Sequence, residues 1–128
     1  MSNSPEETME LGKKMAALAK PGAVFALYGG LGAGKTCWTK GFAQGLGVQD
    51  TVNSPTYTIV SEYDQFNHLD AYRLQGDDDF DAIGGPEIIG GKAISVIEWS
   101  ERLPHSIPDT AIKIHIEVLE GNKRRFTW

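Results

Sequence analysis

The sequence has 128 residues, which suffices for one domain, residues 1–128, with a hydrophobic core that needs no disulfide. Its 12 basic and 17 acidic residues give a net charge of −5, which argues against a protein that grips nucleic acid with a basic face. The single cysteine suits a reducing compartment, so we expect a cytoplasmic protein. No apolar run approaches the roughly 18 residues of a membrane span, so we expect no membrane partner.

The chain begins with the pattern of a capped helix. Ser4 is placed to cap the helix, Pro5 suits its first turn, and Glu7 completes a capping box. Apolar residues then recur at helical spacing until the Pro-Gly pair at residues 21–22. The apolar run that follows, residues 23–28, predicts a buried strand.

Residues 29–36 read GGLGAGKT and match the phosphate-binding pattern G-x-x-x-x-G-K-[ST]. In such a loop the glycines bring backbone N–H groups close to a polyphosphate, Lys35 reaches the β- and γ-phosphates, and the hydroxyl of Thr36 binds Mg²⁺. A predicted helix over residues 37–46, capped at Gly47, follows the loop, and its N-terminus favours an anion. We therefore predict a nucleoside-triphosphate site whose binding residues are Gly30, Leu31, Gly32, Ala33, Gly34, Lys35, Thr36 and Cys37.

A hydroxyl-rich segment, residues 51–58, is interrupted by Pro55 and is predicted to be a loop that leads into a strand over residues 59–63. Beside a γ-phosphate, such loops act as nucleotide switches. A solvated turn explains the composition equally well, so both interpretations stay open.

Alternation in residues 66–74 places His68, Asp70 and Tyr72 on one face of the chain. That face is either solvated or presents Asp70 as a functional carboxylate. The acidic residues 77–79 are predicted to start a solvated helix, because three adjacent carboxylates do not have the spacing of a metal site.

Residues 93–99 (AISVIEW) form an apolar run that leads into Glu98. This pattern predicts a central strand with a carboxylate at its carboxyl end, where ligands bind in α/β sheets. Phosphate-loop enzymes place an acidic residue there to hold or orient the Mg²⁺ shell. We therefore predict Glu98 to be a magnesium-site residue.

Apolar residues alternate with polar ones over residues 112–118, which predicts a half-buried strand with His115 on its solvent face. A hairpin turn at residues 120–123 and a returning strand over residues 124–128 follow. Together the elements predict a three-layer α/β fold of the P-loop NTPase type, with a mainly parallel central sheet and an antiparallel C-terminal hairpin.

Four motifs occur in one chain: the loop at residues 29–36, SPTYT at 54–58, HLDAYRL at 68–74 and IEWSE at 97–101. In their order and spacing the sequence resembles the bacterial TsaE family, the P-loop ATPase subunit of tRNA threonylcarbamoyladenosine biosynthesis. The resemblance implies that the chain binds ATP and Mg²⁺ and works with TsaB and TsaD. It also implies that the chain reaches tRNA only indirectly, through these partners.

The same resemblance implies roles for single residues. Lys35 and Thr36 match the phosphate and magnesium residues of the family, Glu98 the second magnesium-site residue, and Asp70 a carboxylate needed for activity. The switch-like segment would include Thr56 and Thr58. This chain departs from the family where it carries Gly30 in place of an acidic residue and Cys37 in place of a hydroxyl residue.

We expect Mg²⁺-dependent ATP hydrolysis, with Lys35, Asp70 and Glu98 as catalytic residues and Asp70 orienting the attacking water. Two other functions stay open: a small-molecule kinase in which Asp70 deprotonates an acceptor, and a nucleotide-gated binding module with negligible turnover. None of the four arginines lies in the phosphate loop or in residues 54–58, although Arg73 is close to Asp70 in sequence. We therefore expect slow hydrolysis until a partner completes the site.

Overall fold

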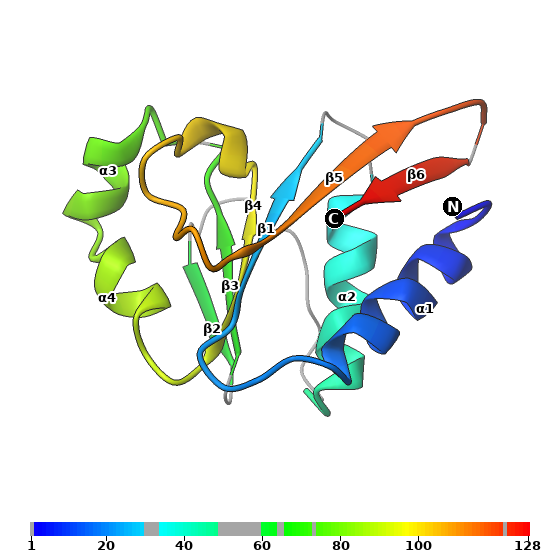
Figure 1. Ribbon diagram of the computed structural model, residues 1–128, viewed down its shortest axis with the longest axis horizontal. Helices are drawn as coiled ribbons and strands as arrows, with labels where there is room; N and C mark the ends of the chain where they lie inside the picture. The colour runs from blue at the N-terminus through cyan, green and yellow to red at the C-terminus, as the bar shows by residue number, and fades with distance from the viewer. Residues whose placement is uncertain (1, 30–33, 49–59, 64–65, 73, 122) are drawn as a thin grey trace.

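A six-stranded sheet with the order β2-β3-β4-β1-β5-β6 forms the centre of the protein (Figure 1). The computed structural model describes residues 2–29, 34–48, 60–63, 66–72, 74–121 and 123–128. The strands are β1 (Val24–Tyr28), β2 (Val60–Tyr63), β3 (Phe66–Asp70), β4 (Ile94–Glu98), β5 (Ile112–Val118) and β6 (Arg124–Thr127). The four central strands run parallel, whereas β2 pairs antiparallel with β3 and β6 pairs antiparallel with β5. The mainly parallel sheet and the C-terminal hairpin are therefore confirmed, and β2 adds an antiparallel strand at the other edge.

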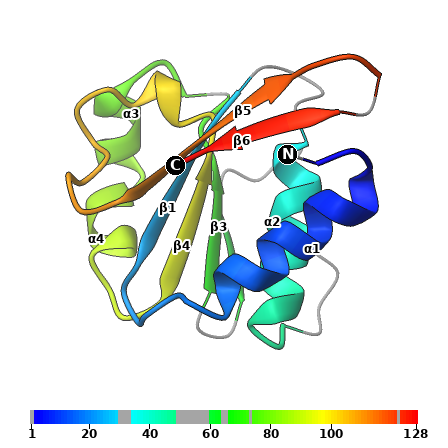
Figure 2. The same ribbon diagram turned by 45° about the vertical axis from the view of Figure 1, so that its right-hand side comes forward.

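Helices cover both faces of the sheet, which gives the three layers expected from the sequence (Figures 1 and 2). On one face α1 (Pro5–Ala16) lies beside α2 (Lys35–Gly45), and α3 (Asp77–Ala82) and α4 (Gly85–Ile89) cover the other face. A short 3₁₀ helix, η1 (Ser100–Arg102), follows β4. Within the described part of the chain, no helix is long and apolar enough to cross a membrane.

The core beneath α1 and α2 fixes the helix that follows the phosphate loop. The ring of Phe42 on α2 lies 4.8 Å from that of Phe25 on β1 and 5.0 Å from that of Trp38, and all three side chains are buried. The two helices also meet closely at Gly41, where a Cβ would lie 1.9 Å from the carbonyl oxygen of Met9. Because no side chain fits there, glycine permits the backbone contact that holds α2 in place.

A second core lies between the sheet and the opposite layer. Leu69 of β3 and Ile97 of β4 pack with Phe80 of α3 and with Leu103, and all four side chains are at most 1% exposed. Alternate residues of β3 and β4 therefore face different cores. This arrangement turns His68, Asp70 and Glu98 toward the α2 side of the sheet and the edge where the strands end.

The predicted starts of the helices are largely confirmed, whereas α1 ends at Ala16, well before the Pro-Gly pair at residues 21–22 that was predicted to end it. Ser4 caps α1 by accepting a hydrogen bond from the N–H of Glu7 at 3.1 Å, whereas the carboxylate of Glu7 accepts from the N–H of Asn3 instead of from Ser4. Helix α2 begins two residues earlier than predicted and ends before Gly47, whose φ is +81°. Helix α3 begins at the acidic cluster, as predicted.

Candidate functional site

Three parallel strands bring the candidate site residues to one edge of the sheet. Strands β1, β3 and β4 run in the same direction, so that Gly29 follows β1 where Asp70 and Glu98 end β3 and β4. Asp70 and Glu98 are direct neighbours in the register of the two strands. The carboxyl edge of a parallel sheet is where α/β proteins bind ligands.

Part of the predicted nucleotide loop lies outside the described residues. This part comprises Gly30, Leu31, Gly32 and Ala33. The segment with Thr56 and Thr58, which the sequence left open between switch and turn, also lies outside them. Gly34, which ends the loop sequence, is described and caps α2 with a left-handed backbone at φ +95°. The N-terminus of α2 therefore opens directly from the loop, as a phosphate site requires.

Lys35 lies at the start of α2 with only 5% of its surface exposed. Its Nζ donates a hydrogen bond to the carbonyl oxygen of Gly29 and lies 3.3 Å from the ring centroid of Trp99. Burial lowers the pKa of Lys35, while the carboxylates of Glu101, Glu98 and Asp70 act in the opposite direction. The ammonium of Lys35 is therefore held above an aromatic face, within the electrostatic influence of three carboxylates.

Glu98 is a buried carboxylate, 2% exposed, that points at the start of α2. Its Oε1 accepts a hydrogen bond from the hydroxyl of Thr36 at 3.3 Å, and its Oε2 is hydrogen-bonded to Nε2 of His68. A carboxylate beside a hydroxyl is the oxygen donor set that Mg²⁺ takes in nucleotide sites, with phosphates and water completing its shell. The residues present therefore fit a magnesium–nucleotide complex.

Asp70 lies beside Glu98 and is 9% exposed. Its Oδ1 accepts a hydrogen bond from the N–H of Tyr72 at 2.9 Å, which orients the carboxylate at the end of β3. Burial raises the pKa of Asp70, the Tyr72 N–H lowers it, and the neighbouring charge of Glu98 raises it further. The solvated alternative for Asp70 is therefore wrong, because this carboxylate is buried within the charged cluster.

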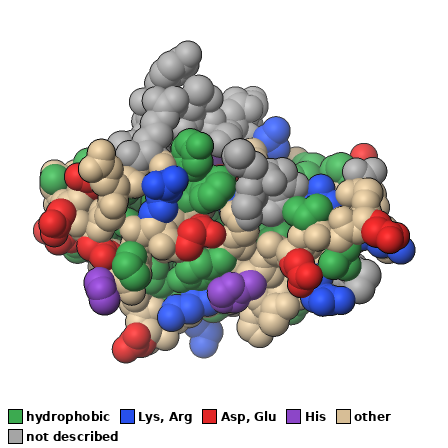
Figure 3. All heavy atoms as spheres, turned by 90° about the horizontal axis from the view of Figure 1, so that it is seen from above, with side chains coloured by type: hydrophobic (Ala, Val, Ile, Leu, Met, Phe, Trp, Pro, Cys, Tyr) green, Lys and Arg blue, Asp and Glu red, His purple; other side chains and the backbone are tan. Residues whose placement is uncertain are grey.

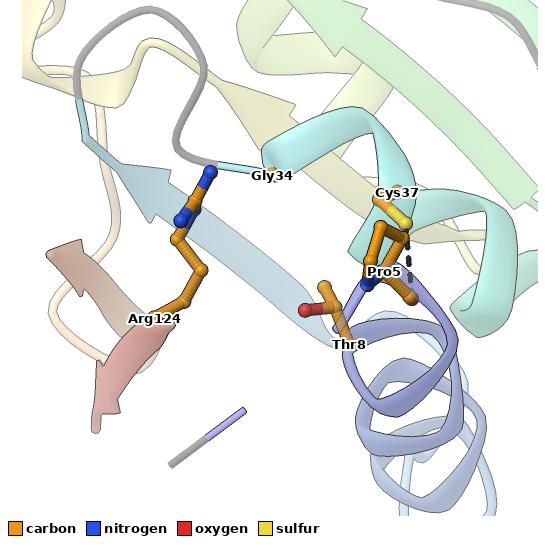
Figure 4. A pocket seen from close by; sticks show the side chains of 5 residues that line it. All are labelled: Pro5, Thr8, Gly34, Cys37 and Arg124. Carbon is orange, nitrogen blue, oxygen red and sulfur yellow. Dashed lines mark hydrogen bonds between the residues drawn. The ribbon is translucent and has the colours of Figure 1, made fainter. Parts of the chain in front are cut away.

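A small pocket lies beside the N-terminus of α2 (Figure 4). It is lined by Pro5, Thr8, Gly34, Cys37 and Arg124, which come from α1, α2 and the start of β6. The thiol of Cys37 donates to the carbonyl oxygen of Pro5 at 3.2 Å and so links the two helices. The pocket adjoins Gly34, the residue at which α2 follows the phosphate loop.

Comparisons with known proteins identify the family of this chain. The family model described as "Threonylcarbamoyl adenosine biosynthesis protein TsaE" matches residues 2–126. The chain belongs to the TsaE family. It is 40% identical to the TsaE protein of Bacillus subtilis over 129 aligned positions, which cover 98% of this chain and 80% of the relative. It is 38% identical to the TsaE protein of Treponema pallidum, with coverage of 99% and 96%.

The fold comparison gives the same family. The crystal structure of YdiB from Bacillus subtilis superposes with a TM-score of 0.81 at 36% identity, and the match covers 98% of this chain and 79% of that chain. The resemblance to the TsaE family and the predicted fold class are therefore confirmed. The individual roles of Lys35, Thr36, Asp70 and Glu98 stay predictions.

Three residues of the site were not predicted. His68 holds Glu98, Trp99 lies under Lys35, and the carboxylate of Glu101 accepts the N–H of Gly29 at 3.1 Å. Strand alternation had placed His68 on the face of Asp70, but a solvated face explained that pattern as well. Trp99 has a left-handed backbone, with φ at +59°, which the TsaE sequence motif at residues 97–101 does not reveal.

Proposed function

We propose that this TsaE-family chain is a single-domain, cytoplasmic P-loop ATPase that hydrolyses ATP with Mg²⁺ and supports threonylcarbamoyladenosine modification of tRNA. The observation that carries the proposal is the meeting of Lys35, Thr36 and Glu98 at the N-terminus of α2. The tRNA pathway is supported by family membership, since the relatives from Bacillus subtilis and Treponema pallidum are both named for tRNA threonylcarbamoyladenosine biosynthesis.

The proposed roles follow from side-chain chemistry. Backbone N–H groups at the start of α2 and the Lys35 ammonium bind the phosphate oxygens. Thr36 and Glu98 would hold Mg²⁺, and the bound ion would supply positive charge beside the phosphates. Asp70 lies beside Glu98 and is placed to accept a hydrogen bond from the attacking water. Catalysis of this kind consists mainly of positioning and electrostatic stabilisation.

The pocket beside α2 is the proposed site of the nucleoside. Thr8 and Arg124 supply polar contacts, and Pro5 and Cys37 supply apolar ones. Cys37 keeps its thiol on the Pro5 carbonyl, so a hydrogen bond to the α-phosphate would have to come from the backbone N–H at this position.

TsaB and TsaD are the proposed partners, and tRNA is reached only through them. Acidic and basic side chains alternate over the described part of the face seen in Figure 3, which does not resemble the basic patch of a tRNA-binding surface. Of the described arginines, Arg102 lies 5.1 Å above the ring of Tyr72, and Arg125 forms an exposed ion pair with Glu117. Arg124 lines the pocket and donates hydrogen bonds to the carbonyl oxygens of Gly121 and Lys123 in its own hairpin. A partner that orders the site or adds a positive group is therefore part of the proposal.

Phosphate release at saturating ATP tests the function. We expect slow release by the chain alone and a clear increase with stoichiometric TsaB and TsaD. Rapid turnover that the partners leave unchanged would refute the partner-dependent ATPase. Phosphate transfer to a small acceptor would indicate a kinase instead, and ATP binding without release under either condition would indicate a nucleotide-gated binding module.

A further inference from the structure

Glu98 is held in place by His68, a residue to which the proposed function assigns no role. His68 lies on β3, two positions before Asp70, and its side chain is fully buried. Its Nε2 hydrogen-bonds to Oε2 of Glu98, while Oε1 of the same carboxylate accepts from Thr36. Each oxygen of Glu98 therefore has its own partner, one on β3 and one on α2.

The surroundings of the two ring nitrogens of His68 indicate which nitrogen carries the proton. An ionised carboxylate only accepts hydrogen bonds, so Nε2 must be the donor to Glu98. Nδ1 is buried and has no hydrogen-bond partner among the described residues. A neutral ring with its proton on Nε2 leaves only a lone pair unpartnered, whereas a proton on Nδ1 would be a buried donor without an acceptor. One tautomer therefore suits this site, and it directs the donor at Glu98.

This contact controls the orientation of the carboxylate. The last torsion of a glutamate side chain is soft, so an unrestrained carboxylate would sample many rotations. With Oε2 held by His68, Oε1 is presented beside the hydroxyl of Thr36. The ring of His68 also stacks on that of Phe66, with the two centroids 6.4 Å apart. If His68 only filled space in the core, this stacking would suffice and no hydrogen bond to Glu98 would be needed.

We propose that His68 is a positioning residue that fixes Glu98 so that its Oε1, the oxygen beside Thr36, and the hydroxyl of Thr36 can bind the magnesium of the nucleotide complex. The inference rests on the proposed function, in which Thr36 and Glu98 hold that ion. Hydrogen-bond partners that orient metal ligands typically contribute about 10–100-fold to metal affinity.

Three variants test the inference by metal binding instead of turnover. The asparagine of His68→Asn is too short to reach Glu98, whereas the glutamine of His68→Gln can place an amide N–H near the position of Nε2. The control is Ser95→Ala, on the same strand as Glu98, which removes a buried hydroxyl that has no hydrogen-bond partner among the described residues. Mn²⁺ replaces Mg²⁺ as the probe, and its uptake in the presence of saturating ADP is followed by electron paramagnetic resonance. Affinity for ADP without metal is measured in parallel.

We expect His68→Asn to weaken Mn²⁺ uptake about 10–100-fold, His68→Gln to recover part of the loss, and Ser95→Ala to bind like the wild type. Affinity for metal-free ADP should change little in all three. Equal Mn²⁺ affinity in folded wild type and His68→Asn would overturn the role of His68. If the wild type with bound ADP takes up no Mn²⁺, the magnesium assignment of the proposed function fails, and the inference fails with it.

The tautomer provides a test that needs no variant to fold. Long-range ¹H–¹⁵N correlation spectra of the wild type identify which imidazole nitrogen is protonated, and His68 is distinguishable because His105 and His115 are exposed. A proton on Nε2 of His68 supports the inference. A proton on Nδ1 alone would overturn it, because the ring would then have no donor for Glu98.

Discussion

Replacing Glu98 by glutamine separates its chemical role from its structural one. The amide is nearly isosteric with the carboxylate, and one orientation of it satisfies both neighbours. Its oxygen can accept from Nε2 of His68, and its NH₂ can donate to the hydroxyl of Thr36, since a hydroxyl also accepts. The variant should therefore fold with the strand intact.

The expected energies differ for stability and for metal binding. Two hydrogen bonds to a charged acceptor become neutral ones, at a cost of about 1 kcal/mol each, and removing a buried charge offsets part of that cost. We expect the free energy of unfolding to fall by at most about 2 kcal/mol. Mg²⁺ loses a charged ligand outright, so its affinity should fall at least as much as on loss of an orienting partner, about 10–100-fold.

The assay compares Mg²⁺ titrations of phosphate release and of ATP binding in wild type and Glu98→Gln, with urea denaturation as the measure of folding. Glu117→Gln serves as the matched control, because Glu117 is an exposed carboxylate on β5 that pairs only with Arg125 among the described residues. If the half-saturating Mg²⁺ concentration and the rate of Glu98→Gln equal those of the wild type, Glu98 is merely the end of a strand and the magnesium assignment is wrong.

Three further substitutions probe the nucleotide loop, the water-orienting carboxylate and the helix contact. Lys35→Ala should keep the fold but weaken ATP binding about 10–100-fold, because it removes charge-assisted hydrogen bonds to the phosphates. Calorimetry measures this affinity, and a wild-type value would argue against the phosphate role of Lys35. Asp70→Asn should lower the turnover of bound ATP about a hundredfold or more and change the affinity for ATP little. If only the affinity for ATP falls, Asp70 is a binding residue and does not orient the water. Gly41→Ala should destabilise the fold by about 1–3 kcal/mol in urea, since its Cβ would lie 1.9 Å from the Met9 carbonyl oxygen, and unchanged stability would contradict that contact.

The sequence predicted the elements of the fold because their signals are local. The cap at Ser4, the strand that ends at Glu98 and the C-terminal hairpin each depend on neighbouring residues and agree with the structure. Loop and strand motifs also located Lys35, Thr36, Asp70 and Glu98 at one edge, because parallel strands end together.

The contacts that connect these residues could not be predicted in the same way. The hydrogen bond from His68 to Glu98 joins residues 30 positions apart and depends on the register of β3 against β4. The placement of Lys35 over Trp99 depends on a left-handed backbone in a residue type that seldom adopts it. A solvated face and a buried site share the same strand alternation, so only the packing of α2 over that face of β3, where Phe42 meets Phe66, distinguishes them.

The charge balance at the sheet edge explains why magnesium belongs to the proposed site. The carboxylates of Glu101, Glu98 and Asp70 all act electrostatically on the single ammonium of Lys35, so these four groups together carry a net negative charge when ionised. A triphosphate is itself strongly anionic, and such a cluster would repel it if no other cation were present. In the proposed site a divalent ion held by Glu98 and Thr36 would supply the positive charge that lets the phosphates approach these carboxylates. The acidic character of the chain is thus compatible with nucleotide binding through a metal ion.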